Sequence, residues 1–272
     1  MEKINLKALQ DVELEILKDF INICDTYNLK YVLAYGTCIG AIRHKGFIPW
    51  DDDIDVAMPR EDYEKLINIA DEVMGDKYVL QTYNSEKNCG LIFGKIRKNG
   101  TVMSEVYSHH IDMHQGVWID IFPYDNVPDD EIERRKIFQK IYIYKNLYII
   151  KSGYKLPEDK KNLLNYIVYY LSKFFMIFIP LDLLIKNIDR LVKKYNDIPC
   201  RFMACYGDNV IENIMPCEMM DNLIEVDFAD CKAKVFQNYD YYLNKIYGDY
   251  MKLPSKEERK NWTFHFIKDF KI

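Results

Sequence analysis

Four aspartates crowd into one short stretch of the chain, 51-DDDIDVAMP-59, in which Ile54 and Val56 alternate with Asp53 and Asp55. This alternation predicts a strand over residues 53–58, with the two apolar side chains on one face and both carboxylates on the other. Two like charges about 4 Å apart repel by about 4 kcal/mol near a protein surface. Hard divalent cations bind carboxylate oxygens and remove that repulsion. The stretch therefore predicts a metal-binding strand.

A second acidic strand is predicted over residues 117–122, VWIDIF, where Asp120 stands between two isoleucines. An ionised carboxylate buried among apolar residues is costly without a partner. A place beside Asp53 and Asp55 removes that cost, because three carboxylates can hold one or two Mg²⁺ or Mn²⁺ ions for a phosphoryl displacement. Two alternatives stay open: a solvated acidic loop for the first stretch, and a hydrogen-bonded structural role for Asp120. A calcium loop is disfavoured, because Val56 stands where its sharp turn needs glycine.

Residues upstream of the aspartates are candidate phosphate ligands. Gly36 and Thr37 end a predicted strand and open a short helix, so their backbone N–H groups are available to phosphate oxygens. Arg43, His44 and Lys45 add positive charge just before the acidic stretch, which suits a diphosphate. A plain turn and a surface basic cluster remain the alternatives for these two groups.

Composition limits the classes of partner and the compartment. The net charge of −5 disfavours a general nucleic-acid binder. The seven cysteines are scattered and form neither a CxxC pair nor a zinc-ligand spacing, which a reducing cytoplasm permits. Residues 1–20 mix charged and apolar side chains without a continuous apolar run, so we expect no secretory signal and a cytoplasmic protein.

The pattern of the chain changes near residue 128. Strand patterns occur mostly before this point, and helical periodicity dominates from 129 to about 195. We therefore expect an α+β fold, or an α/β core with a helical extension in the second half. The predicted helices are 3–28, 38–44, 59–74 and 238–247, and the predicted strands are 30–35, 53–58, 77–83, 91–97, 117–122, 202–206 and 225–235.

One segment is strongly apolar, LLNYIVYYLSKFFMIFIPLDLLI at residues 163–185, but Asn165, Lys173, Pro180 and Asp182 interrupt it. A membrane-spanning helix needs about 20 apolar residues with few charges. The interruptions therefore disfavour a span. We expect a buried helical hairpin, and peripheral docking on a membrane surface is the alternative.

Three motifs together resemble a known family. The run GTCIGAIRHKGFIPWDDDIDVAMPREDYEKL, the later VWIDIFP and the C-terminal YGDYMKLPSKEERKNWTFH are similar to the signature of the LicD family, which has relatives among fukutin and the fukutin-related proteins, within the nucleotidyltransferase superfamily. The resemblance implies a nucleotidyltransferase-like mixed β-sheet flanked by helices. Together with the change of pattern near residue 128, it implies a catalytic core at residues 1–128 and a mainly helical region at 129–272 that completes the active site and the acceptor side.

The same resemblance implies a function. The expected reaction moves phosphocholine, or a related phosphoalcohol such as ribitol or glycerol phosphate, from a CDP-linked donor such as CDP-choline to a hydroxyl of a cell-surface glycan, and it releases CMP. The acceptor would be a teichoic acid or lipopolysaccharide precursor, free or lipid-linked, which extends the expected location to the inner face of the membrane. The alternatives are a nucleotidyltransferase that attaches a nucleoside monophosphate, and a catalytically silent nucleotide- or glycan-binding protein.

The resemblance also assigns residues. The expected catalytic and metal-binding carboxylates are Asp53, Asp55 and Asp120. The ligands of the donor phosphates that the resemblance implies are Gly36, Thr37, Arg60, Lys95 and Arg97, and Arg43 and Lys45 join them because of their positive charge. Arg259 and His265 match the C-terminal motif without an implied role. A choline group would need aromatic rings, and Trp50 and Trp118 are the first candidates because they adjoin the acidic strands.

Overall fold

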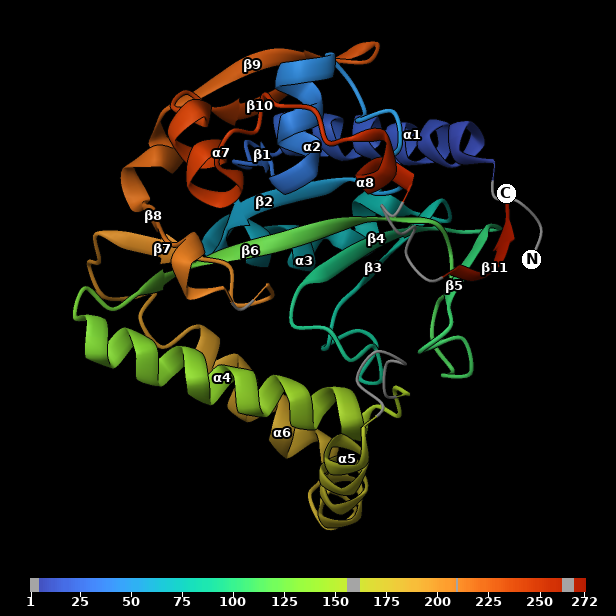
Figure 1. The fold of residues 1–272 in the computed structure, drawn as a ribbon, viewed down its shortest axis with the longest axis vertical. Helices are drawn as coiled ribbons and strands as arrows, with labels where there is room; N and C mark the ends of the chain where they lie inside the picture. Colours follow the sequence, from blue (N-terminus) through green and yellow to red (C-terminus); the bar gives the residue numbers. More distant parts are fainter. Residues whose placement is uncertain (1–4, 156–161, 209, 261–266) are drawn as a thin grey trace.

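The computed structural model describes residues 5–155, 162–208, 210–260 and 267–272, and a mixed β-sheet lies at its centre (Figure 1). The strands follow the order β1-β2-β6-β4-β3, and β7 and β8 extend the sheet from the far end of β6. Only the pair β2–β6 is parallel among the paired strands of this sheet in the described part of the chain. The strands are β1 (Val32–Leu33), β2 (Asp55–Pro59), β3 (Tyr78–Gln81), β4 (Gly94–Lys98), β6 (Trp118–Val127), β7 (Phe202–Ala204) and β8 (Met215–Pro216).

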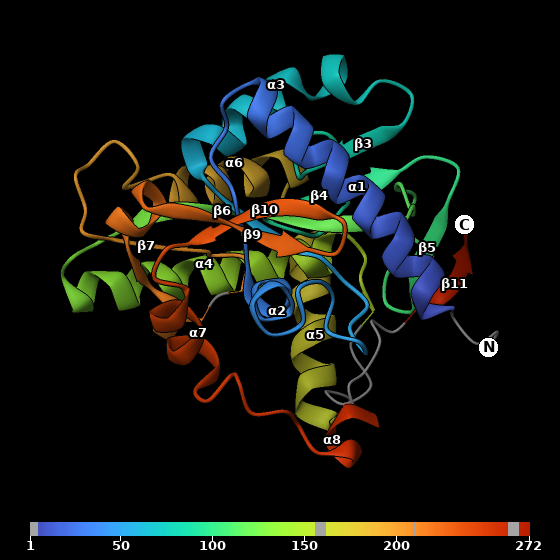
Figure 2. The same ribbon diagram turned by 90° about the horizontal axis from the view of Figure 1, so that it is seen from above.

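Two amphipathic helices cover one face of the sheet. Helix α1 (Leu6–Thr26) begins at Asn5, whose side chain accepts a hydrogen bond from the backbone N–H of Ala8, and α3 (Arg60–Met74) follows β2 directly. Figures 1 and 2 show both helices on the same side of the sheet. Their apolar residues recur at helical spacing and pack onto the strands, which forms the main hydrophobic core.

The opposite side carries α2 (Tyr35–Ile39), which continues as the π-helix η1 (Gly40–His44), and α7 (Tyr239–Tyr247) (Figure 2). The hairpin of β9 (Leu223–Phe228) and β10 (Cys231–Phe236) packs next to β1. Buried residues of this hairpin and of α7, such as Phe228 and Tyr242, belong to the same core as α1 and the central sheet. The C-terminal part of the chain therefore completes the core of the first half.

A helical extension packs below the sheet (Figure 1) and has a core of its own. Helix α4 (Glu131–Lys151) contacts α6 (Leu181–Val192) through buried residues such as Ile141 and Ile188, and α5 (Leu163–Met176) follows α4. Among the described residues, the remaining elements are β5 (Val102–Glu105), which pairs with β11 (Ile267–Lys271), η3 (Ile211–Asn213), η4 (Cys217–Asp221) and α8 (Lys256–Lys260). The expected mixed sheet with flanking helices is confirmed.

The expectation of a buried hairpin over 163–185 is wrong for its first helix. Only Met176 is buried among the residues of α5, whereas α6 buries Leu184, Ile185 and Ile188 against α4. The spacing of apolar residues alone does not show whether the apolar side of a helix packs against the rest of the protein. Within the described part of the chain, no single helix is long and apolar enough to cross a membrane; α5 and α6 together meet that test by length and composition only, with a bend of 107° at their break.

Candidate active site

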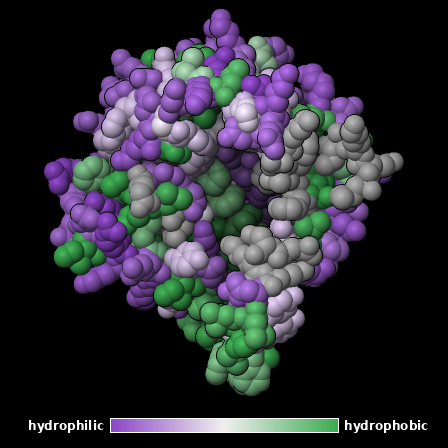
Figure 3. All heavy atoms as spheres, in the orientation of Figure 1, coloured by the Kyte–Doolittle hydropathy of each residue, from purple (hydrophilic) through white to green (hydrophobic). Residues whose placement is uncertain are grey.

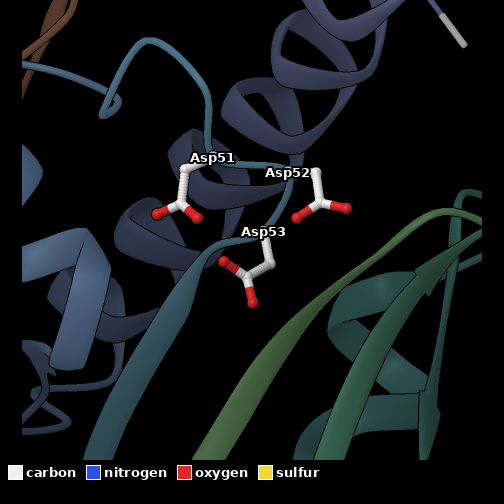
Figure 4. Close-up of side chains that lie close together, drawn as sticks. All are labelled: Asp51, Asp52 and Asp53. Carbon is white, nitrogen blue, oxygen red and sulfur yellow. The ribbon is translucent and has the colours of Figure 1, made fainter. Parts of the chain in front are cut away.

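Three of the four aspartates converge in the segment that leads into β2. Figure 4 shows the carboxylates of Asp51, Asp52 and Asp53 close to one another, and oxygen atoms of all three lie within 4.8 Å of each other. Asp51 and Asp52 are buried and Asp53 is partly exposed. The strand starts at Asp55 and not at residue 53 as expected. Asp53 therefore lies outside the strand, and the alternation of side chains between the two faces does not determine its direction. The irregular backbone before β2 brings the three carboxylates together.

The fourth aspartate of the stretch lies opposite Asp120. Asp55 and Asp120 are register partners in the parallel strands β2 and β6, so their side chains lie on the same face of the sheet. The pKa of Asp55 is raised well above its ordinary value, first by burial and then by the negative charges of Asp53, Asp120 and Asp51. The three predicted carboxylates therefore share one electrostatic environment.

Lys95 completes a row of charged residues across three strands. It is the register partner of Asp120 on β4, and its Nζ lies 2.9 Å from Asp120 Oδ1 in an ion pair that is almost fully buried. The same Nζ lies 3.9 Å from the centre of the Trp118 ring, and the guanidinium of Arg97 lies 4.7 Å from it. Cations of the protein itself thus contact Trp118, which makes this ring a poor candidate for a choline site.

Arg97 is directed toward the protein and not toward a ligand. Its Nε donates to Gln81 Oε1 at 2.6 Å and its Nη1 donates to the carbonyl of Gly116 at 2.8 Å. Burial lowers its pKa, partly offset by the charges of Glu105 and Asp120. Arg97 therefore lies two residues from Lys95 along β4, where it contacts Trp118 and Gln81.

Glu13 of α1 is an acidic residue of this site that sequence reasoning missed. Its side chain is fully buried, and neither carboxylate oxygen has a hydrogen-bond partner among the described residues. Its pKa is raised well above the ordinary value by burial, then by the charges of Asp53, Asp52, Asp51 and Asp120. One turn earlier, Gln10 Nε2 donates to the carbonyl of Asp51 at 2.9 Å. Helix α1 thus contacts the acidic segment directly.

A signal for Glu13 was present in the sequence. It stands four residues after Leu9 and four before Leu17, at the centre of the apolar stripe of an amphipathic helix. A carboxylate at such a position is buried when the stripe packs, so it is either protonated or close to a cation.

Gly36 and Thr37 hold the acidic segment in place. A Cβ on Gly36 would lie 3.0 Å from Asp51 Oδ2, so the absence of a side chain lets this carboxylate approach the first turn of α2. Thr37 Oγ1 accepts a hydrogen bond from the backbone N–H of Asp55 at 2.8 Å. The two residues that were expected to touch phosphate therefore contact the aspartates.

A basic cluster adjoins the acidic segment, because Trp50 directly precedes Asp51. The Arg259 guanidinium lies 4.7 Å from the centre of the Trp50 ring, and the His44 ring contacts the same tryptophan edge-on at 6.1 Å. Arg43 Nε donates to His44 Nε2 at 2.9 Å. Burial lowers the pKa of His44, and the charges of Arg43 and Arg259 lower it further. His265 lies outside the described residues.

Lys45 and Arg60 are two further predicted phosphate ligands that lie away from this cluster. Lys45 is exposed beside the β9–β10 turn, where its carbonyl accepts from the backbone N–H of Ala229 at 2.8 Å. Arg60 makes a buried two-point ion pair with Asp125, with both N–O distances at 2.8 Å. Asp125 lies five residues beyond Asp120 along β6, which is about 16 Å at the rise of a strand.

Two comparisons with known proteins show the family of this chain. The sequence model described as "LicD/FKTN/FKRP, nucleotidyltransferase domain" matches residues 28–151. The chain is also 31% identical over 267 residues to the lipopolysaccharide cholinephosphotransferase LicD of Haemophilus influenzae, with 96% of each chain covered. The chain belongs to the LicD family. Shorter similarities are found to uncharacterized proteins of two rickettsias: RP689 of Rickettsia prowazekii (35% over 83 residues, 29% of this chain and 31% of that protein) and RT0683 of Rickettsia typhi (42% over 48 residues, 18% and 16%).

The range that matches the family model contains most but not all residues of the candidate site. Residues 28–151, which match the LicD family model, include the aspartates, Gly36, Thr37 and Lys95. Glu13 and Arg259 lie outside that range, and the tertiary structure brings both residues close to the acidic segment.

Proposed function

We propose that this protein transfers phosphocholine, or a related phosphoalcohol, from a CDP-linked donor to a hydroxyl of a cell-surface glycan such as a lipopolysaccharide precursor. The observation that carries the proposal is the convergence of Asp51, Asp52 and Asp53 beside the Asp55–Asp120 pair, next to the basic cluster of Arg43, His44 and Arg259. The full-length similarity to a lipopolysaccharide cholinephosphotransferase supports the choice of substrate.

The residues of the site fit a divalent cation. The carboxylate oxygens of Asp51, Asp52 and Asp53 are the hard ligands that Mg²⁺ and Mn²⁺ prefer, and their spacing allows them to share an ion. The buried carboxyl of Glu13, which has no partner among the described residues, points to a missing positive charge nearby. The aspartates from Asp51 to Asp55 and Asp120 would hold the metal. A bound cation supplies charge neutralisation for the diphosphate of the donor.

The protein's own residues provide the remaining parts of the reaction. Arg43 and Arg259 would bind the diphosphate, because they concentrate positive charge at the edge of the acidic segment. The glycan hydroxyl then forms a bond to the phosphorus of the phosphoalcohol as the bond to CMP breaks, so catalysis is mainly positioning and electrostatic stabilisation. The hydroxyl proton passes to a carboxylate of the site, and Asp120 is the candidate because it lies beside Asp55 in the row of charged side chains.

The arrangement of the chain suggests where the two substrates bind. Figure 3 shows a hollow near the centre of one face, in the region that β4 and β6 occupy in Figure 1. We propose that a nucleotidyltransferase-like core formed from residues 1–128 binds the donor there. Residues 129–272 would complete the active site, with Arg259 at the donor diphosphate, and the acceptor side. All seven cysteines are free thiols, which supports a cytoplasmic location.

The test is a reconstituted reaction with a defined product. Purified protein would be incubated with Mg²⁺, CDP-choline and a lipooligosaccharide acceptor, and the acceptor would be analysed by mass spectrometry. The proposal expects an added phosphocholine and released CMP. Parallel reactions with CDP-ribitol, CDP-glycerol and CTP would identify another phosphoalcohol or nucleotidyl transfer. Absence of any covalent product, with nucleotide binding intact, would support a silent binding protein.

A further inference from the structure

Helix α5 exposes large apolar side chains over about half of its circumference. Leu164, Leu171, Phe174 and Phe175 are 69%, 53%, 56% and 61% exposed, and their spacing of three, four and seven residues places them on one side of the helix. The exposed surface continues beyond the helix through Phe178, at 73%. Figure 3 shows hydrophobic residues gathered at the end of the molecule that α5 forms in Figure 1. A patch of this kind marks an interaction surface.

The other side of α5 is fixed to the protein, so the orientation of the apolar surface is defined. Tyr169 donates its hydroxyl to the carbonyl of Tyr154 at 2.8 Å, and Lys151 Nζ donates to the carbonyl of Met176 at 2.7 Å. The Met176 side chain is buried. The helix is therefore attached along its inner side, and its apolar outer side has no covering element among the described residues.

Charge distribution indicates what covers this surface. Residues 131–195 contain fourteen Lys and Arg but six Asp and Glu, although the whole chain has a net charge of −5. The one charged residue within α5 is Lys173, whose long side chain allows its ammonium group to reach the interface while its stem contacts apolar surroundings. A strongly basic helical unit with an exposed apolar helix matches the surface of a membrane that contains anionic lipids.

We propose that the outer side of α5 inserts into the interfacial layer of an anionic lipid membrane. A second copy of the chain fits less well, because it would bring an equally basic unit against this one. The helix has 14 residues and is about 21 Å long, shorter than the hydrocarbon core of about 30 Å. It therefore docks on the membrane and does not span it. The inference does not depend on the transferase chemistry, since docking is measured without any donor or acceptor.

Vesicle binding tests the proposal. The full chain would be mixed with vesicles of phosphatidylcholine alone or with phosphatidylglycerol, and the bound fraction measured by flotation. We expect binding to the anionic vesicles that weakens as the salt concentration rises. The double variant Leu171→Ser/Phe174→Ser should bind at least about tenfold more weakly, because two exposed apolar side chains no longer enter the lipid.

The control is the variant Met251→Ser/Leu253→Ser, which removes two exposed apolar side chains outside the helical unit. It should bind within about twofold of the wild type, by the usual small effect of surface substitutions. Both variants should melt at the wild-type temperature, because none of the four side chains is buried. As a second readout, tryptophan fluorescence of Phe174→Trp should be quenched by brominated anionic lipid.

Three results would overturn the proposal. The first is a wild-type protein that binds neither kind of vesicle. The second is equal binding by the wild type and the Leu171→Ser/Phe174→Ser variant, together with unquenched tryptophan fluorescence in the Phe174→Trp variant. The third is a wild-type dimer in light scattering that the double variant converts to a monomer, which would assign the surface to a second copy.

Discussion

Asp55 and Asp120 face each other as register partners across the parallel strands β2 and β6, and Lys95 on β4 pairs with Asp120 from the other side. This row places two carboxylates and one ammonium group on a single face of the sheet. The segment that precedes β2 adds Asp51, Asp52 and Asp53 at the end of the row. Strand pairing thus sets one half of the acidic site, and an irregular loop sets the other half.

Removal of a single carboxylate should stop turnover and leave the fold intact. For Asp53→Ala and Asp55→Ala we expect a loss of about a hundredfold or more in kcat, the usual scale for a lost electrostatic contact in a catalytic site. Neither residue belongs to the hydrophobic core, so the melting temperature should stay close to that of the wild type. Release of CMP from CDP-choline measures the first effect and calorimetry the second. Full activity in either variant would contradict the assignment.

Glu13 should make the stability of the metal-free protein depend on pH. Its pKa is raised in the folded state, so the folded state binds this proton more tightly than the unfolded state does. Stability from this group is fully present below the unfolded pKa of about 4.3 and is lost as the pH rises toward the folded value. In the presence of a metal chelator, the free energy of unfolding of the wild type should therefore fall more between pH 5 and pH 8 than that of Glu13→Gln.

Urea unfolding at the two pH values measures this difference. The Gln side chain has nearly the same size and does not ionise, so it controls for packing. Asp55 also has a raised pKa and contributes in the same direction in both proteins. Parallel pH profiles for the wild type and Glu13→Gln would mean that the pKa of Glu13 is not raised in the folded state.

Breaking the buried ion pair of Arg60 and Asp125 should lower stability and leave catalysis unchanged. Both side chains are buried, so Asp125→Ala leaves a buried guanidinium with only Glu64 as an acidic partner among the described residues, at 3.3 Å. Loss of one partner from a buried pair costs about 3–5 kcal/mol. The free energy of unfolding in urea should fall by this order, with KM for the donor unchanged in the protein that remains folded. A large rise in KM would instead place Arg60 at the donor.

The pKa of His44 should change when the donor diphosphate binds to the basic cluster. Burial and the charges of Arg43 and Arg259 keep the pKa of its imidazole below the ordinary value of about 6.5, so the ring is neutral at pH 7. A diphosphate bound between these residues adds negative charge and should raise that pKa. NMR titration of the ring with and without CDP-choline measures the shift, and the variant His44→Gln assigns the signal. An unchanged pKa would place the donor phosphates elsewhere.

The local sequence pattern was sufficient to predict those parts of the site whose geometry depends on consecutive residues. The alternation at Ile54 and Val56 predicted the direction of Asp55, and the isolated Asp120 predicted a second acidic strand beside the first. Helix α1 followed from its periodicity, and the turn at Gly36 and Thr37 from its position after a strand. Each of these features depends on a few consecutive residues, because backbone geometry alone decides which way their side chains point.

Only the tertiary structure decided which distant residues meet. Glu13 and Arg259 stand at opposite ends of the sequence, and packing of α1 and of the C-terminal segment brings them to the edges of one acidic segment. The same packing gave Arg60 a buried partner on β6 and left the outer side of α5 exposed. An apolar pattern indicates that burial of a side chain lowers the free energy of the folded state. The element that covers this side chain is determined by the arrangement of the whole chain.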